Sequence, residues 1–187
     1  MSTTGNHQGV IAQAAAHAYA SLDDLFQNAA DKGEAPLLVI CDGIADPHNL
    51  GAIIRSAETA GAHGVIIPKR RAAGLTAVAA RASAGALAYM PVHKTVNLAG
   101  LIDELKERGV WVFGAEADGT VGLYEADFAG PTAIVIGSEG EGISRLVRQK
   151  CDFIVSIPMR GKVNSLNASN AAAVLLFEAV RRRTYGK

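Results

Sequence analysis

The sequence has only two cysteines among its 187 residues, which argues against a disulfide-stabilised secreted domain. Cys41 and Cys151 lie in separate apolar runs, and neither belongs to a Cys-x-x-Cys pair or to a Cys/His cluster. The five histidines, at positions 7, 17, 48, 63 and 93, also lack the spacing of metal ligands. We therefore expect two reduced, buried thiols and no metal site.

Long apolar runs are missing as well. No stretch is both long enough and apolar enough to cross a bilayer as a helix, so we expect no membrane partner. The first 20 residues have no basic start followed by an uninterrupted apolar core, which a secretory signal peptide would show. Together with the scarcity of cysteine, these absences predict a cytoplasmic protein.

Three common enzyme motifs do not occur. The chain contains neither GxGxxG nor GxxxxGK followed by Ser or Thr, which weakens the case for a dinucleotide-binding enzyme or a nucleoside triphosphatase. It also lacks the GxSxG elbow that carries the nucleophile of α/β-hydrolases. Any catalytic site must therefore be built from other loops.

The chain has no net charge, because 18 basic residues balance 18 acidic ones. The distribution is nevertheless uneven, since residues 145–187 hold nine of the basic residues and only two of the acidic ones. A basic segment of this kind is expected where a protein meets a polyanion, but it is equally typical of a solvated helix end. Charge alone leaves both interpretations open.

Short apolar runs alternate with segments of helical pattern. The predicted strands cover residues 37–41, 64–68, 110–113, 132–136 and 153–157. The predicted helices cover residues 50–60, 76–84, 97–108, 143–150 and 168–183. Because the strands are continuously apolar rather than alternating, they are typical of a parallel sheet covered by helices on both faces. We therefore predict an α/β fold.

The length of the chain favours a single domain. Residues 1–34, rich in alanine and polar side chains, are expected to form an N-terminal extension or helical arm, and residues 35–187 the domain itself. Residues 118–131 are expected to form a loop or a small hairpin. Ligands of open parallel sheets bind beyond the carboxyl ends of the strands, so the loops after the strands are the places to look for chemistry.

The loop after the first predicted strand leads into a helix that carries an arginine. Asn49 is placed to cap that helix. Arg55 lies among apolar and small residues, where a charged side chain needs an anionic partner. A structural salt bridge to Asp42 or Glu58 and a contact to a phosphate or ligand are both compatible with this pattern.

The loop GSEGEG at 137–142 follows the fourth predicted strand. Its three glycines allow the backbone to approach a ligand closely, whereas its two carboxylates disfavour a phosphate cradle. By itself the run is also compatible with an ordinary turn from strand to helix, with a glutamate near the positive end of the helix dipole.

The third loop, at 157–170, is crowded with polar side chains. Pro158 and Gly161 break the chain, and Asn and Ser residues follow at 164, 165, 167, 169 and 170. One Asn or Ser suffices to cap the helix that begins there, so capping explains Ser165 or Asn167 but not the whole run.

The three loops together resemble the ordered motifs of the SpoU/TrmH (SPOUT) family of RNA ribose 2′-O-methyltransferases. The residues that carry the resemblance are NLGAIIRSA at 49–57, IGSEGEG at 136–142, and IPM at 157–159 with SLNAS at 165–169. The runs GNHQG at 5–9 and DGIADPHNLG at 42–51 are most similar to the RlmB-type branch, whose members methylate a guanosine of large-subunit ribosomal RNA. An antibiotic-resistance-type relative that methylates an adenosine, a transfer-RNA methyltransferase and a catalytically silent RNA-binding relative remain alternatives.

The resemblance implies a cofactor, partners and site residues. It implies S-adenosylmethionine as methyl donor, no catalytic metal, RNA as substrate, a C-terminal trefoil knot, and a homodimer with active sites at its interface. The implied catalytic residues are Asn49, Arg55, Glu139, Ser165 and Asn167. The implied donor-binding residues are Ala115, Glu116, Gly137, Ile157 and Leu166.

Arg55 resembles the catalytic arginine of the family. Because a guanidinium stays protonated in proteins, we expect Arg55 to contact an RNA phosphate and to stabilise the developing alkoxide, rather than to remove a proton. Further candidates for phosphate contacts are Lys69, Arg70, Arg71, Arg160, Lys162, Arg181, Arg182 and Arg183.

Overall fold

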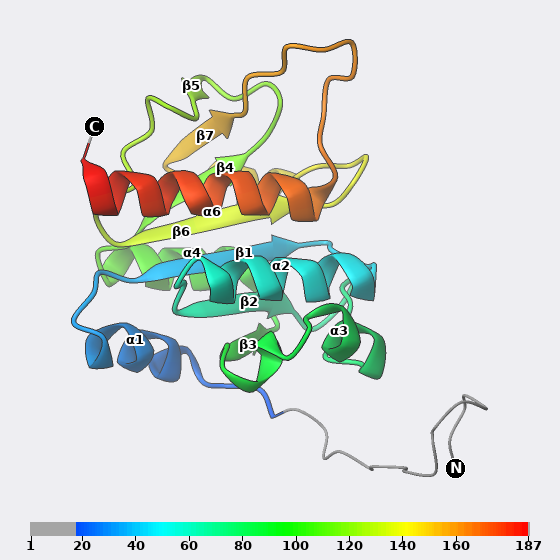
Figure 1. Cartoon of the computed structure of the whole chain (residues 1–187), viewed down its shortest axis with the longest axis vertical. Coiled ribbons are helices and arrows are strands. Elements are labelled where there is room, and N and C mark those ends of the chain that lie inside the picture. The colour runs from blue at the N-terminus through cyan, green and yellow to red at the C-terminus, as the bar shows by residue number, and fades with distance from the viewer. Residues whose placement is uncertain (1–17, 187) are drawn as a thin grey trace.

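The computed structural model of the chain describes residues 18–186. Seven strands form one parallel sheet in the order β3-β2-β1-β6-β4-β7-β5 (Figure 1). Their bounds are β1 Leu37–Asp42, β2 Gly64–Pro68, β3 Val92–Thr95, β4 Trp111–Ala115, β5 Val121–Gly122, β6 Thr132–Gly137 and β7 Phe153–Ser156.

Helices cover both faces of this sheet, which confirms the predicted α/β class. The helices are α1 Leu22–Asp31, α2 Pro47–Thr59, α3 Ala77–Ala82, α4 Leu98–Glu107, α5 Arg145–Lys150 and α6 Ala168–Tyr185, with a short 3-10 turn η1 at Ala86–Ala88. Helices α2, α3 and α6 pack into the core on one face, and α1, α4 and α5 into the core on the other. Figure 1 shows α2 and α6 in front of the strands and α4 behind them.

Alternation along each strand builds these two cores. Val39 and Cys41 of β1 point into the core under α2 and α6, whereas Leu38 and Ile40 point into the core under α1 and α4. Cys41 is fully buried, and burial raises the pKa of its thiol to about 12. Cys151 is partly buried, with its pKa also raised to about 12 by burial. Both cysteines are free, as predicted.

Two strands escaped the sequence-based prediction because they have no continuous apolar run. Strand β3 contributes only Val92 to the buried core, while His93, Lys94 and Thr95 are half-exposed at the edge of the sheet. Strand β5 has two residues and lies inside the segment expected to be a loop or hairpin. Periodicity cannot reveal strands of this length and polarity.

The described part of the predicted extension packs on the domain. Helix α1 starts with a capping box at Ser21 and Asp24, and its Leu25 is fully buried against the sheet. The approach is close, since a Cβ on Gly64 of β2 would lie 2.1 Å from Cγ of Leu25. The GNHQG run lies outside the described residues, and the trefoil knot implied by the resemblance stays a prediction.

Helix α2 begins earlier than expected. Pro47 occupies its first turn, and the N-cap is Asp46, whose side chain accepts a hydrogen bond from the backbone of His48 at 2.9 Å. The prediction that Asn49 caps this helix is therefore wrong, and its side chain is available for other contacts. Within residues 18–186, no helix has the length and apolarity needed to cross a bilayer.

Candidate active site

A pocket of about 760 Å³ opens at the carboxyl ends of β4, β6 and β7. This edge of the sheet is where an open parallel fold binds its ligands. The five predicted donor-binding residues all line this pocket, namely Ala115, Glu116, Gly137, Ile157 and Leu166. Three of the predicted catalytic residues line it too, namely Glu139, Ser165 and Asn167.

The wall of the pocket beyond β6 is a loop with an unusual backbone, which we name the glycine loop (residues 137–142). Gly140 and Gly142 have φ angles of +92° and +69°, which favour glycine. Gly137 packs directly on the end of the loop, since a Cβ there would lie 2.2 Å from the carbonyl carbon of Gly142. The loop therefore presents backbone rather than side chains to the pocket at these positions.

Three polar side chains from distant parts of the sequence meet beside this loop, and we name them the amide–carboxylate network. Asn49 of α2 donates from Nδ2 to Oε1 of Glu139 at 3.1 Å. Asn167 donates from Nδ2 to Oδ1 of Asn49 at 3.0 Å and also to Oε1 of Glu139. The backbone N–H of Ala168 donates to the same Glu139 oxygen at 3.3 Å. The carboxylate is therefore held from α2 and from the start of α6.

Asn167 also serves as the N-cap of α6. Its Oδ1 accepts hydrogen bonds from the backbone of Ser169 at 2.9 Å and from the Ser169 hydroxyl at 2.6 Å. The capping interpretation of this segment is therefore correct for Asn167, but it uses only the oxygen of the side chain. The nitrogen remains for Glu139 and Asn49, so one residue starts a helix and completes the network.

Arg55 lies on α2 with an exposed side chain, so the expectation that it is buried among apolar residues is wrong. Within residues 18–186 its guanidinium has no hydrogen bond or ion pair. The salt bridge to Asp42 or Glu58 does not form, and Asp42 instead accepts from the backbone of Ser144 at 2.7 Å. Arg55 does not line the pocket of its own chain. It remains a free cation on the helix that carries Asn49.

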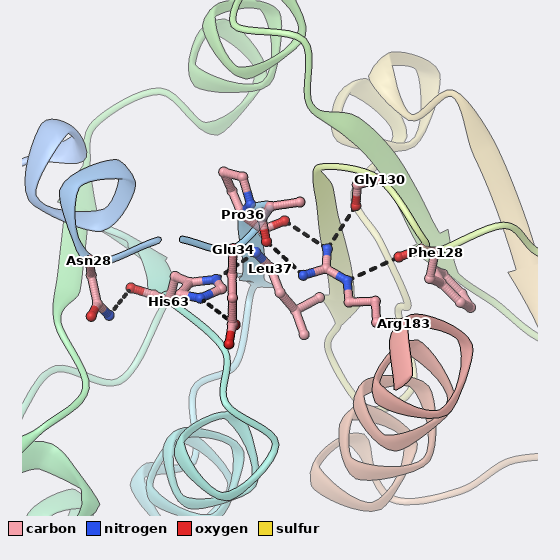
Figure 2. Close-up of polar contacts among 9 residues, drawn as sticks. Asn28, Glu34, Pro36, Leu37, His63, Phe128, Gly130 and Arg183 are labelled. Carbon is pink, nitrogen blue, oxygen red and sulfur yellow. Dashed lines mark hydrogen bonds and ion pairs between the residues drawn. The ribbon is translucent and has the colours of Figure 1, made fainter. Parts of the chain in front are cut away.

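The predicted phosphate contacts separate into three groups. Arg183 is wrong as a candidate, because its guanidinium is turned into the protein and donates to the backbone carbonyls of Ala35, Pro36, Phe128 and Gly130 at 2.6 to 3.1 Å (Figure 2). The residues with exposed side chains are Lys69, Arg70, Arg71, Arg160 and Lys162.

Arg181 and Arg182 form ion pairs with Glu178, one helical turn earlier on α6. Glu178 is almost fully buried, and the hydrogen bond from Arg181, aided by Arg182, holds the pKa of this carboxyl below its usual value. These two arginines thus neutralise a buried carboxylate. Sequence position alone could not distinguish them from exposed phosphate ligands.

The described residues include no group of three or more His, Cys, Asp or Glu side chains arranged to hold a metal ion. The pocket instead combines apolar walls with backbone groups and amides. Such a lining suits an organic ligand that carries a flat ring and a few polar atoms.

Comparisons with known proteins fit this arrangement. The sequence model of the SpoU rRNA Methylase family matches residues 36–177, which include the glycine loop and the whole amide–carboxylate network. The chain belongs to the SpoU rRNA methylase family. All three loops of the SpoU pocket thus fall inside the matched region.

Two curated relatives cover nearly all of this SpoU chain. A Bacillus subtilis protein assigned to the TrmH family of tRNA/rRNA methyltransferases is 53% identical over 180 residues, 96% of this chain and 72% of that protein. The 23S rRNA (guanosine-2′-O-)-methyltransferase RlmB of Ralstonia nicotianae is 50% identical over 182 residues, 97% of this chain and 72% of that enzyme.

A solved structure supports the same family. The SpoU methyltransferase AviRb of Streptomyces viridochromogenes, determined in complex with AdoMet, matches with a TM-score of 0.75 and 37% sequence identity. The match covers 80% of this chain and 61% of AviRb. The chain therefore spans less than two thirds of that structure.

Proposed function

We propose that this protein transfers a methyl group from S-adenosylmethionine to a ribose 2′-hydroxyl of RNA. The observation that carries the proposal is the placement of the amide–carboxylate network against the pocket at the carboxyl edge of the sheet. Donor pocket and polar network share Glu139 and Asn167, so a methyl donor and a hydroxyl acceptor would meet at their common border.

The pocket has the features that a methyl donor of this kind requires. Its volume of about 760 Å³ lies within the range of small-molecule sites. The apolar side chains of Ile157 and Leu166 offer a surface for the adenine ring, and the bare backbone of Gly137 offers hydrogen-bonding groups at its edge. When bound, the donor supplies an electrophilic methyl carbon on a sulfonium.

The residues of the chain then have the task of orienting the acceptor. Glu139, held by Asn49 and Asn167, places a carboxylate at the pocket border where it accepts from a nucleotide hydroxyl or amine. Orientation of this kind removes much of the entropic barrier to a displacement in line with the breaking bond. Ser165, exposed at the same border, adds a hydroxyl to the acceptor side.

Arg55 supplies the positive charge in this proposal. Its guanidinium stays protonated and has no partner among the described residues, so it is free to contact a phosphate beside the reacting ribose. There it stabilises the negative charge that develops on the 2′-oxygen, while the proton leaves to phosphate or water.

We further propose that the chain works as a homodimer with active sites at the interface. Two observations support this arrangement. Val174 and Phe177 of α6 are large apolar side chains that lie exposed at 37% and 51%. In addition, Arg55 does not line the pocket of its own chain, so a second copy could bring its Arg55 to that pocket.

The substrate that we propose is a guanosine of large-subunit ribosomal RNA, in the cytoplasm. The 50% identity to the Ralstonia enzyme, whose name states this reaction, supports the proposal. Methylation of a transfer RNA is the second candidate, because the Bacillus relative is assigned to a family named for both RNA classes.

The test is to incubate the protein with labelled S-adenosylmethionine and separate unmodified large-subunit and transfer RNA transcripts, then map the modified nucleotide by mass spectrometry. We expect 2′-O-methylguanosine in the large-subunit transcript. Label in transfer RNA alone would favour the second candidate. RNA binding without incorporation into either transcript would identify the chain as a silent RNA-binding relative.

A further inference from the structure

The point where the glycine loop rejoins the fold is held by two carboxylates. The backbone N–H of Ile143 donates to Oε1 of Glu116 at 3.0 Å, and the next N–H, of Ser144, donates to Oδ2 of Asp42 at 2.7 Å. Asp42 ends β1 and Glu116 follows β4, the two strands that flank β6. Hydrogen bonds from both neighbouring strands thus hold the end of the loop that follows β6.

The Glu116 carboxylate is itself fixed by α5. Arg148 forms an ion pair with it, with Nε 2.6 Å from Oε2, and Arg148 also donates from Nη2 to Asp118 at 3.0 Å. The Glu116 side chain is 15% exposed. Both of its oxygens are engaged within the protein, so this side chain supports the pocket wall that it lines.

The shape of the glycine loop depends on this support. Ser138 and Gly142 exchange two backbone hydrogen bonds of 3.0 Å, which close the loop on itself. The Glu116 oxygen lies so close to Gly142 that a Cβ there would come within 2.8 Å of it. A loop closed at its base and anchored at its exit presents Glu139 in one place, which is the preorganisation that a binding site requires.

We propose that Asp42 and Glu116, with Arg148, are positioning residues that hold the glycine loop in the shape that binds S-adenosylmethionine. The inference rests on the proposed function only in so far as the loop lines a donor pocket. It assigns to Glu116 a role through the loop backbone, and it adds Asp42 and Arg148 to the residues on which donor affinity depends.

The first test is donor affinity, measured by isothermal titration calorimetry with S-adenosylmethionine and no RNA. Glu116→Ala removes the acceptor of the Ile143 N–H, and we expect binding to weaken roughly tenfold. Glu116→Gln keeps an acceptor oxygen in the same place and should restore most of the affinity. Asp42→Ala should act in the same direction as Glu116→Ala.

A second readout is amide exchange by NMR, which reports the loop directly. We expect faster exchange at Ile143 in Glu116→Ala and at Ser144 in Asp42→Ala. The matched control is Asp152→Ala, which removes a carboxylate that accepts from the backbone of Val112 at 2.9 Å and pairs with Lys106. This control lies at the amino end of the sheet and should leave donor affinity unchanged.

Two results would overturn the inference. One is a loss of donor affinity in Asp152→Ala as large as that in Glu116→Ala, which would show that lower stability alone weakens donor binding. The other is unchanged affinity and unchanged amide exchange in Glu116→Ala. Neither measurement involves RNA, so a wild-type protein that binds the donor but methylates no RNA would contradict the proposed function and leave this inference standing.

Discussion

Two polar clusters lie at opposite ends of the sheet, and they differ in how completely they are satisfied. At the amino end, Arg183 donates to four backbone carbonyls, while the ring of His63 is fully buried between the backbone of Leu37 and Glu34 (Figure 2). We name this group the amino-end clasp. At the carboxyl end, the amide–carboxylate network borders an open pocket, and Arg55 near it has no partner among residues 18–186.

This difference shows how charged residues that stabilise the fold can be distinguished from charged residues that serve the function. Each end has one glutamate and one arginine, although the amino end adds a histidine and the carboxyl end two asparagines. A cluster whose polar groups are paired within the protein holds backbone segments together, whereas an exposed cluster with an unused cation is prepared for a ligand. Mutations in the amino-end clasp should therefore lower the stability of the protein, whereas mutations in the amide–carboxylate network should lower its activity.

The largest effect is expected for Arg55→Ala. If Arg55 stabilises charge during methyl transfer, turnover on a bound RNA substrate should fall at least about 100-fold. The melting temperature should stay within about 1 °C, because the guanidinium has no hydrogen bond or ion pair with residues 18–186. Single-turnover methylation at saturating RNA measures the first quantity, and thermal unfolding the second.

The control is Arg81→Ala, which removes an exposed arginine from another helix, α3. It should keep near-normal turnover. If Arg55→Ala kept it as well, the assignment of Arg55 to the chemistry would be wrong.

For Arg183→Ala we expect a loss of stability rather than a direct loss of turnover. Four carbonyl oxygens would each lose the hydrogen bond from Arg183, although those of Pro36, Phe128 and Gly130 keep one from Thr132, and we expect a loss of about 3 kcal/mol in the free energy of unfolding. For a chain of this size that corresponds to a melting temperature lower by roughly 10 °C. Arg145→Ala on the exposed side of α5 should change it little. A stable Arg183→Ala protein with weakened RNA binding would instead restore Arg183 as a phosphate ligand.

His63 should make the clasp sensitive to acid. Its Nδ1 accepts from the backbone of Leu37 at 2.9 Å, so Nε2 carries the proton and faces Glu34. Burial is the main reason why the pKa of His63 lies below its usual value. The unfolded chain therefore binds a proton that the folded chain does not as pH falls below about 6.5, and stability should decline in that range, by at most about 1.4 kcal/mol per pH unit.

Thermal unfolding between pH 7.5 and 5.0 measures this decline. His63→Asn offers an oxygen in place of Nδ1 and should flatten the profile, although it lowers the starting stability. His48→Gln, at an exposed position, should leave the profile unchanged. A wild-type profile that is already flat would contradict the role of His63.

The smallest effect is expected for the exposed basic residues. Arg70→Ala or Lys162→Ala should lower the slope of log binding constant against log salt by about 0.7 to 0.9 for each phosphate contact removed. Arg182→Ala should leave the slope unchanged, because this arginine pairs with Glu178. Filter binding over a salt series measures the slope. An identical reduction in all three variants would contradict the division into phosphate-binding residues and the paired Arg182.

Much of the fold followed from the sequence for a clear reason. Runs such as 37–41 and 133–136 are apolar throughout because both faces of the sheet are covered, so they stand out in the sequence. Strand β3 did not, because its polar residues lie at the sheet edge. Helix α2 was placed late because Pro47 begins it and the capping residue is Asp46.

The sequence predicted which residues form the site but not how their side chains are arranged. Spacing along the chain placed Asn49, Glu139 and Asn167 at strand or helix ends, and the structure brings them into contact. No sequence pattern could show that Arg183 turns inward while Arg55 stays free, because such differences depend on carbonyls supplied by residues more than 50 positions away. The carboxylates of Asp42 and Glu116 were missed as anchors for the same reason.

The double use of Asn167 has a consequence for the order in which the protein forms. The side chain that starts α6 also completes the network with Asn49, which lies 118 positions earlier. Contacts of such long range carry a high loop-closure cost, so they form only when the intervening chain is ordered. The network is therefore absent from any state of the chain in which α6 is not docked, and methyl transfer requires that helix in place.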